Sequence, residues 1–288
     1  MYSNKLYTPL RYPGGKGRFA PYIARVMRDN NLVGGHYLEP YAGGAGVALE
    51  LLFDGIAEEV HINDLDSAVY DFWISATRFT SELISLVESE PVTIEAWHHW
   101  RSVLFGKVEV SQLHRGFATL FMNRTNRSGI LKAGVIGGKA QDGKYRIDAR
   151  YMRDVLVSRL GRIGEYSKKI NVYGEDALSL LSRCDEFLPE RSLIYLDPPY
   201  YVKGQGLYRN FYSHHDHLAI AAMLQLRKFP RRWIVSYDDA PEIREMYSRS
   251  HGVGYGLKYT ARRRYTGAEV MFFSTKLKSV PLDLPEAA

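Results

Sequence analysis

The stretch LIYLDPPYYV, residues 193–202, joins a short apolar run to an acid, two prolines and two tyrosines. Residues 193–196 predict a strand that is covered on both faces of a sheet. Pro198 and Pro199 cannot donate to a β-ladder, so we expect the strand to end at Asp197. Ligands of open α/β sheets bind beside the carboxyl ends of the strands, which makes Asp197 a candidate site residue. A solvated exit from strand to loop is the alternative interpretation of these residues alone.

The segments before this strand predict an open α/β sheet. A strand is expected over 37–40, followed by a glycine-rich turn and a helix in GVALELLFDG, residues 46–55. A second strand over 60–63 ends in the acidic sequence NDLD. Strand, glycine turn, helix, strand and acidic end form the opening of a doubly wound nucleotide-binding fold.

The middle of the chain interrupts this pattern. SAVYDFWISATRF (67–79), the region of WHHWRSVLFG (97–106) and SQLHRGFATLFMNR (111–124) predict helices, and GVIGGKAQDGKYRID (134–148) predicts a β-hairpin with Asp142-Gly143 at its turn. The α/β pattern resumes at 169–181, with a helix from about Asp216 and strands over 233–239 and 269–275. We therefore expect an α/β sheet domain, residues 1–70 and 168–288, with an inserted, mostly helical domain, residues 71–167.

The charge of the chain is concentrated in the expected insertion. Residues 101–169 contain fifteen Lys or Arg and five Asp or Glu, whereas the whole chain of 288 residues has a net charge of only +6. A confined basic segment rich in arginine indicates a polyanionic partner, most simply nucleic acid. The single cysteine excludes a disulfide framework, and no segment has the length and apolar character of a membrane span. These features predict a cytoplasmic protein.

The glycine cluster is the first candidate binding site. Gly43, Gly44 and Gly46 in EPYAGGAGVALEL, residues 39–51, allow a tight turn and close backbone approach to a ligand, with a helix N-terminus behind them. Asp64 follows at the end of the next strand, where a carboxylate can accept hydrogen bonds from ribose hydroxyls. This arrangement favours a nucleotide-like ligand over a turn that only connects two elements.

Two further polar motifs have competing interpretations. SHHDH, residues 213–217, contains several potential metal ligands, but Ser213 and Asp216 have the spacing of a helix capping box, which is the favoured reading. FMNRTNRSGIL, residues 121–131, places Asn and Arg in the basic segment. These side chains read adenine and guanine edges, although a polar loop that only ends a helix would look the same.

Taken together and in this order, the motifs resemble the Dam-like adenine-N6 DNA methyltransferase family over most of the chain. RYPGGKGRF (11–19) is similar to the family's N-terminal motif, EPYAGGAGV (39–47) to its cofactor loop and NDLD (63–66) to its ribose-binding motif. FMNRTNRSG (121–129) resembles its target-recognition region, and YLDPPY (195–200) its catalytic motif. The cofactor loop departs from the family pattern, because Ala45 stands where glycine is common and Gly46 follows one position later.

The resemblance implies a Rossmann-like methyltransferase sheet, S-adenosylmethionine as methyl donor and double-stranded DNA as partner. Asp64 would hold the cofactor ribose and Asp176 would face its adenine. Asp197 and Pro198 would accept hydrogen bonds from the N6 amine of a flipped adenine, on which Tyr200 would stack. The implied catalytic residues are Asp197, Pro198, Pro199 and Tyr200; the cofactor-binding residues are Tyr12, Lys16, Glu39, Pro40, Tyr41, Gly43, Gly44, Asp64, Asp176 and Asp197.

For DNA, we expect base contacts from the Asn-Arg region and phosphate contacts from the basic residues that follow it. The expected DNA-binding residues are Arg124, Asn126, Arg127, Ser128, Lys132, Lys139, Lys144 and Arg146. The target sequence is not readable, and GATC is one candidate. We expect a cytoplasmic protein of bacterial or phage type that acts on nucleoid DNA as a monomer or dimer, without metal and without a membrane. It would serve restriction–modification or orphan methylation.

Three alternatives stay open at the level of sequence. Cytosine N4 or a base in RNA could be the methylated amine, although Asp rather than Ser before Pro-Pro-Tyr favours adenine by family habit. A DNA-binding protein that keeps the fold without catalysis is the third, and the intact run from Asp197 to Tyr200 argues against it.

Overall fold

The computed structural model describes residues 5–11, 16–202, 212–259 and 265–281, and the chain forms two compact units. Unit 1 comprises residues 1–6, 16–65 and 175–288, and unit 2 comprises residues 7–15 and 66–174. Residues 7–15, 66–70 and 168–174, which were expected in the sheet domain, group with unit 2. In the described part of the chain, no helix is long and apolar enough to cross a membrane.

Unit 1 is built on a mixed β-sheet. Its described strands lie in the order β2-β1-β4-β5-β7-β6. The first four are parallel to one another, and β7 is antiparallel to both β5 and β6. The strands are β1 (Gly35–Glu39), β2 (Ala57–Asn63), β4 (Ser192–Leu196), β5 (Arg232–Asp238), β6 (His251–Tyr259) and β7 (Tyr265–Phe273).

Strand β4 occupies the middle of this sheet and ends where the sequence predicts. All five of its residues are buried, as expected for a strand with both neighbours parallel and both faces covered. It pairs with β1 on one side and with β5 on the other. The parallel arrangement brings the carboxyl ends of β1, β4 and β5 to one edge of the sheet, where ligands bind in folds of this type.

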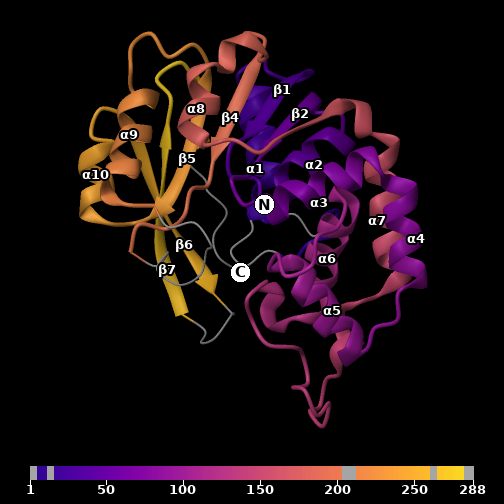
Figure 1. Ribbon diagram of the computed structural model, residues 1–288. Coiled ribbons are helices and arrows are strands. Elements are labelled where there is room, and N and C mark those ends of the chain that lie inside the picture. The colour runs from indigo at the N-terminus through magenta and orange to yellow at the C-terminus, as the bar shows by residue number, and fades with distance from the viewer. Residues whose placement is uncertain (1–4, 12–15, 203–211, 260–264, 282–288) are drawn as a thin grey trace. The chain divides into compact units, whose positions relative to one another are not determined.

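Two helices of unit 1, α8 (Ala177–Ser182) and α9 (His214–Leu224), begin after a residue whose side chain caps the first turn. Helix α9 has a capping box, in which the Ser213 side chain accepts from the amide of Asp216 and the Asp216 carboxylate accepts from the amide of Ser213. The capping interpretation of the SHHDH motif is therefore confirmed. Helices α9 and α10 lie along one flank of the sheet (Figure 1). The helices are α1 (Ala20–Asp29), α2 (Gly46–Phe53), α8 (Ala177–Ser182), α9 (His214–Leu224) and α10 (Pro241–Met246), with short 3-10 helices at Lys16–Phe19 and Cys184–Glu186.

Unit 2 is mostly helical and is organised around α6, in which every residue from 116 to 125 is buried. Gly116 allows α6 to approach α3 closely, because a Cβ there would lie 2.5 Å from the carbonyl oxygen of Asp71. The elements are α3 (Ser67–Arg78), α4 (Thr80–Ser89), α5 (Ile94–Leu104), α6 (Gln112–Thr125), α7 (Arg153–Glu165) and strand β3 (Ile170–Tyr173), with short 3-10 helices at Arg127–Gly129, Ile147–Arg150 and Ser167–Lys169.

The prediction of a β-hairpin over residues 134–148 is wrong. Residues 134–146 form turns, and the only strand-like pairing that the described part of the segment makes is a bridge between Val135 and Asn126. Left-handed backbone at Gly137, Gly138 and Gln141 turns the chain repeatedly, so no two extended runs can pair. The Gln141 side chain holds these turns, because it donates to the carbonyl of Ile136 and accepts from the amide of Ile147.

Candidate active site

Acidic side chains follow three neighbouring parallel strands of unit 1 at their carboxyl ends. Glu39 is the last residue of β1, Asp197 follows β4, and Asp238 is the last residue of β5. Glu39 and Asp238 are buried, and Asp197 retains 25% of its side-chain exposure. Since burial opposes charge on a carboxyl group, each of these acids needs donors close by, and the structure supplies them.

Asp197 is held on one of its two oxygens. Ser236, on β5, donates from Oγ to Asp197 Oδ1 over 2.8 Å, and Lys16 Nζ lies 3.7 Å from the same oxygen. Within the described residues, Oδ2 has no hydrogen bond. Burial raises the pKa of Asp197 to about 6, while the charge of Lys16 and the bond from Ser236 oppose that rise. The carboxylate is therefore ionised near neutral pH, with one oxygen oriented and the other available as an acceptor.

Lys16 links this carboxylate to a second, fully buried one. Its Nζ lies 2.7 Å from Glu269 Oε2, on the antiparallel strand β7, and it donates to the Tyr200 hydroxyl over 3.2 Å. Burial lowers the pKa of Lys16, but Asp197 and Glu269 together outweigh it, so the pKa is raised above its ordinary value. Lys16 is consequently a fixed positive charge between two acids.

Glu269 is the centre of this network. Its carboxylate accepts from Tyr200 OH at 2.9 Å and from Tyr255 OH at 2.6 Å, in addition to Lys16. Three donors on a carboxylate with no solvent exposure satisfy most of its lone pairs, which allows the charge to persist inside the unit. The last residue of the Asp-Pro-Pro-Tyr motif is thus fixed by a strand that lies about seventy residues further along the chain.

Asp238 fixes the loop that leaves the motif. Its two carboxylate oxygens accept from the backbone amides of Tyr201 and Val202, at 2.8 and 2.9 Å. The Tyr200 side chain is buried, with Lys16 Nζ 5.3 Å from the centre of its ring. The sequence Asp197–Tyr200 is therefore held at its start by Ser236 and Lys16 and just beyond its end by Asp238.

The glycine turn after β1 is tied to the end of β2. Asp64 accepts from the amide of Gly43 over 2.9 Å, and the Asn63 side chain donates to the carbonyl of Pro40 over 2.8 Å. Gly43 has a φ of 46° and Ala45 has the same value, so Ala45 adopts the left-handed backbone that glycine prefers. The departure from the family pattern is thus accommodated with the turn conformation kept. Close packing follows at Gly46, where a Cβ would lie 3.0 Å from the Cα of Gly17.

The remaining cofactor residues expected from the sequence take different positions in unit 1. Glu39 is buried and accepts from Tyr37 OH and from the amide of Ala48, both at 3.0 Å, so it anchors the start of α2. Burial raises its pKa to about 8. Tyr41 donates to the hydroxyl of Tyr212 over 3.2 Å. Gly44 lies in the same turn as Gly43, exposed Asp176 caps α8, and Tyr12 lies outside the described residues.

In unit 2, the expected base-reading residues divide into two groups. Arg124 is buried and donates from Nε to the carbonyl of Pro9 over 2.6 Å. Asn126 is fully buried, accepts from Trp97 Nε1 over 2.7 Å and donates to two backbone carbonyls. Both side chains hold unit 2 together in this conformation. Arg127 and Ser128 are exposed, so only they could contact bases without rearrangement.

The expected phosphate contacts are all on the surface of unit 2. The exposed residues are Lys132, Lys139, Lys144 and Arg146. Long cationic side chains that stay in solvent can reach a polyanion, whereas buried ones cannot. Their exposure supports a role in DNA binding but does not assign any of them to a particular phosphate.

Four residues of the site were missed in the sequence: Ser236, Asp238, Tyr255 and Glu269. Asp238 had a visible signal, because it ends a strand beside Asp197 in the same way as the acids that were identified. Glu269 also had one, since an acid in the apolar strand of EVMFF is expensive to bury without a partner. Ser236 and Tyr255 had none, because only the pairing of the strands brings them to the site.

A cluster of potential metal ligands lies elsewhere on the sheet of unit 1. His36, Glu59 and His61, on β1 and β2, place one ligand atom each within 4.8 Å of one another. His36 Nδ1 and His61 Nε2 are 3.0 Å apart and share a hydrogen bond. Burial, followed by the charge of His36, lowers the pKa of His61 to about 3, so this ring is neutral at physiological pH.

Comparison with known proteins identifies the family. Among solved structures, the chain resembles a candidate RNA methyltransferase, PH1948, of Pyrococcus horikoshii (12% identity, TM-score 0.41, covering 96% of this chain and 90% of that one). It also resembles LPL1258 of Legionella pneumophila str. Philadelphia 1 (15% identity, TM-score 0.30, covering 89% and 86%). Both likenesses are too distant to carry an argument, and no curated protein matches the sequence. The model of the D12 class N6 adenine-specific DNA methyltransferases, in contrast, matches residues 12–264, so the chain belongs to this family of DNA adenine methyltransferases.

Proposed function

We propose that unit 1 binds S-adenosylmethionine beside the glycine turn and presents Asp197 to the N6 amine of an adenine extruded from duplex DNA. Membership in the family implies S-adenosylmethionine as the methyl donor in general. The residues of this chain that hold the donor and the base are the new part of the proposal. The observation that carries it is Asp197 at the carboxyl end of β4, with Oδ1 held and Oδ2 open among the described residues.

The chemistry of the amine explains why an oriented carboxylate is needed. The lone pair of the adenine N6 is delocalised into the ring, so the amine is a poor nucleophile. Hydrogen bonds from its two N–H groups to Asp197 Oδ2 and to the Pro198 carbonyl would favour a tetrahedral nitrogen with a more localised lone pair. The same acceptors would stabilise the positive charge that develops on the nitrogen as it takes the methyl group, while the sulfur of the donor keeps the electron pair of the broken sulfur–carbon bond. The nitrogen would then lose one proton to solvent, which restores the neutral amine.

The ionisation of Asp197 sets the conditions under which it can accept. Burial raises its pKa to about 6, so the group is mostly ionised above that pH. Lys16, 3.7 Å away and fixed by Glu269, contributes the positive charge that opposes burial. A carboxylic acid in its place would donate on one oxygen and lose an acceptor, so activity should fall as the pH drops below about 6.

The glycine turn fits the methyl donor. Its backbone approaches a helix N-terminus with no side chain beyond Cβ between Gly43 and Val47, and the Asp64 carboxylate stands at the turn. Half-buried Tyr41 and Tyr212 offer aromatic surface on the same unit. When bound, S-adenosylmethionine supplies an electrophilic methyl group on a sulfonium. Asp64 would accept from the ribose hydroxyls, and Asp176, at the start of α8, would face the adenine of the donor.

The DNA side of the proposal rests on unit 2. An adenine must leave the base stack before an enzyme can reach its amine, and the displaced duplex has to be held meanwhile. Exposed Arg127 and Ser128 are proposed to contact bases, and the exposed lysines and Arg146 to contact phosphates. The Tyr200 ring, fixed through its hydroxyl by Glu269, is proposed to form one wall of the pocket for the extruded base.

The test is transfer of labelled methyl groups from S-adenosylmethionine to unmethylated genomic DNA, followed by sequencing for N6-methyladenine. We expect methylation at one recurring sequence. Asp197→Ala should lose about a hundredfold or more in rate, as removal of one oriented group in an active site commonly does. Asp197→Asn should lose less, because an amide oxygen can still accept.

Asp185→Ala removes an exposed acid outside the site and provides the matched control, expected to act like the wild type. Calorimetric binding of S-adenosylmethionine to each variant separates loss of chemistry from loss of the donor. Methyl transfer at the wild-type rate by Asp197→Ala would contradict the proposed role of this carboxylate. Label that enters RNA and not DNA would contradict the proposed substrate while leaving the carboxylate chemistry intact.

A further inference from the structure

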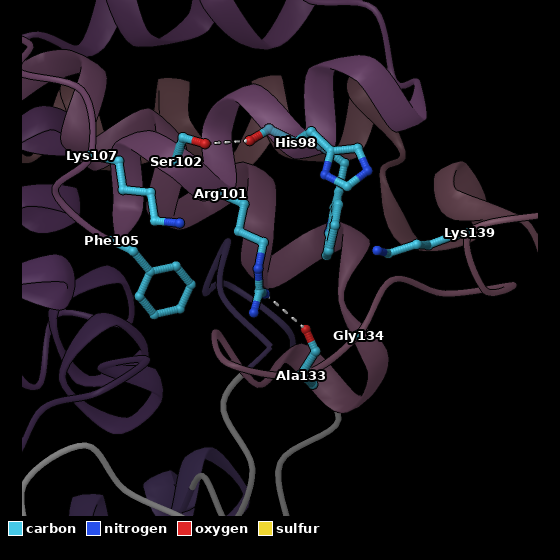
Figure 2. Close-up of a pocket in the computed structure, with 9 residues that line it drawn as sticks. His98, Arg101, Ser102, Phe105, Lys107, Ala133, Gly134 and Lys139 are labelled. Atoms are coloured by element: carbon cyan, nitrogen blue, oxygen red, sulfur yellow. Dashed lines mark hydrogen bonds between the residues drawn. The ribbon is translucent and has the colours of Figure 1, made fainter.

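Unit 2 contains a pocket that the target-recognition motif does not explain. It has a volume of about 690 Å³ and lies between α5, with the residues that follow this helix, and the segment around Ala133 and Lys139. All of its lining residues belong to unit 2. Figure 2 shows side chains from both segments pointing into the same space.

The lining of the pocket is basic. Arg101, Lys107 and Lys139 contribute three cations, and among the described residues that line the pocket there is neither Asp nor Glu. A concave surface with charges of one sign concentrates ligands of the opposite sign. The ligand class that the lining selects is therefore an anion.

Arg101 is held in a fixed position inside the pocket. Its guanidinium carbon lies 5.1 Å from the centre of the Trp97 ring and 4.9 Å from that of Phe105, and Nη1 donates to the carbonyl of Ala133 over 3.4 Å. Trp97 is itself buried and anchored by its bond to Asn126. A guanidinium has five donors, so one weak bond leaves the planar fork able to bind an oxyanion with two parallel bonds.

A fourth cation adjoins the pocket from its other wall. Gly134 lines the pocket, and a Cβ at this position would lie 2.6 Å from Nη2 of Arg127, so that guanidinium rests directly against the glycine. The amide of Arg127 also donates to the carbonyl of Gly134 over 3.0 Å. Arg127 is one of the two exposed residues proposed to read bases. An anion in the pocket would consequently sit next to the base-reading turn.

We propose that this pocket binds a phosphodiester group of the DNA backbone, with Arg101 as the bidentate ligand and Lys107 and Lys139 as flanking charges. The proposal rests on the proposed function, because DNA is the substrate that supplies the phosphate. A phosphate anchored here would set the register of the duplex relative to Arg127 and Ser128. Phosphate contacts fix position and orientation, and base contacts then supply specificity.

The experiment measures DNA affinity as a function of salt. Fluorescence anisotropy with an unmethylated duplex, between about 50 and 300 mM KCl, gives the slope of log K against log of salt concentration. Arg101→Gln, Lys107→Gln and Lys139→Gln should each reduce the slope by about 0.9, and the triple variant by about 2.7. At 0.15 M salt the counterion effect alone amounts to about a fivefold loss of affinity per contact.

Lys168→Gln is the matched control, since Lys168 is an exposed lysine of unit 2 outside the pocket, and its slope should equal that of the wild type. Arg101→Lys is a second control for misfolding. It keeps the positive charge and should keep the salt slope, although it loses the two parallel hydrogen bonds of the guanidinium. Thermal melting of each variant confirms that unit 2 is folded. Pocket variants with the wild-type slope would overturn the proposal.

Two further measurements show which phosphate the pocket binds and whether a negative result contradicts the pocket assignment or the proposed function. If the pocket binds a free nucleotide instead, AMP or inorganic phosphate will bind the wild type, Arg101→Gln will abolish that binding, and the DNA slope will not change; that result rejects the proposal. Methyl transfer by the wild type to the same duplex is measured in parallel. If the wild type does not methylate DNA, the proposed function fails; if it does and the slopes are unchanged, only the pocket assignment fails.

Discussion

Replacement of Glu269 by glutamine tests how the buried network of Lys16 and Glu269 sets the pKa of Asp197. Glu269 and Asp197 share Lys16, whose Nζ lies 2.7 Å from one carboxylate oxygen and 3.7 Å from the other. These two distances place the carboxylate oxygens at most about 6.4 Å apart. Their repulsion raises the pKa of Asp197, after burial, which is the larger cause. Glu269→Gln removes that repulsion and leaves Lys16 with Asp197 as its only acidic partner in the network.

The size of the effect follows from the separation. At an effective dielectric constant of about 20, two charges 6.4 Å apart repel by about 2.6 kcal/mol, which corresponds to about 2 pH units. A quarter of the Asp197 side chain is exposed, and the solvent there screens part of this interaction. We therefore expect the pKa of Asp197 to fall by about 1 to 2 units from its value of about 6.

Lys16→Met should move the same pKa in the opposite direction. At 3.7 Å and an effective dielectric constant of about 20, the attraction lost is about 4.5 kcal/mol before screening by solvent at the exposed quarter of the side chain. Because Lys16 is the main influence that opposes burial at Asp197, the pKa of Asp197 should rise above its value of about 6. The sign of the difference between the two variants is more informative than either magnitude.

The assay is the pH dependence of kcat/KM for methyl transfer to unmethylated duplex DNA, from about pH 4.5 to 9, because its acid limb reports the free enzyme. The hydroxyls of Tyr195 and Tyr255, which also face Asp197, have pKa values well above the neutral range because they are buried. They do not titrate in the acid limb. We expect that limb to move below pH 6 in Glu269→Gln and above it in Lys16→Met. Equal limbs in both variants, with unchanged binding of S-adenosylmethionine, would refute the assignment.

Two further predictions concern stability. Glu39 has a pKa of about 8 in the folded chain against 4.5 for the free group, so the folded state keeps this proton to a higher pH than the unfolded state. The free energy of unfolding should therefore fall by on the order of 4 kcal/mol as the pH rises from about 5 to 8. Glu39→Gln should abolish that fall, as measured by urea denaturation across this pH range. Asn126→Ala leaves the indole of Trp97 and two backbone carbonyls without their partner inside unit 2, so it should lower the free energy of unfolding by about 3 kcal/mol, measured by denaturation, without changing the methylated sequence. A new sequence preference in Asn126→Ala would return that side chain to the base-reading group.

The sequence predicted those parts of unit 1 whose signals are local. The end of β4 at Leu196, the turn at Gly43 and the helix that starts after Ser213 each depend on residues a few positions apart. Prolines that end a ladder, glycines that allow left-handed backbone and a serine that caps a helix act on their own neighbourhood. Such features are present in the sequence before any tertiary contact forms.

The errors in unit 2 have a physical reason of the same kind. Arg124 and Asn126 have the chemistry of base-reading side chains, and the sequence contains no sign that they are buried. The segment 134–148 contains a strong turn signal at Asp142-Gly143. The left-handed backbone of Gly137, Gly138 and Gln141, however, breaks the extended runs that a hairpin needs. Residue type predicts what a side chain can bind, whereas burial decides whether it is available to do so.

The network around Asp197 shows why this candidate catalytic carboxylate could be predicted from the sequence while the residues that set its pKa could not. Asp197 is adjacent to the prolines that identify it, but Lys16 and Glu269 are 253 positions apart and meet only because β7 inserts antiparallel beside β5. Ser236 and Asp238 reach the motif from β5 for the same reason. Burial raises the pKa of Asp197, and the cation fixed beside it opposes that rise, which favours the ionised, hydrogen-bond-accepting form. The cation, in turn, is fixed only by a second acid that Tyr200 and Tyr255 stabilise. The motif therefore predicts the proposed catalytic carboxylate, whereas the pKa of that carboxylate depends on residues that the sheet brings beside it.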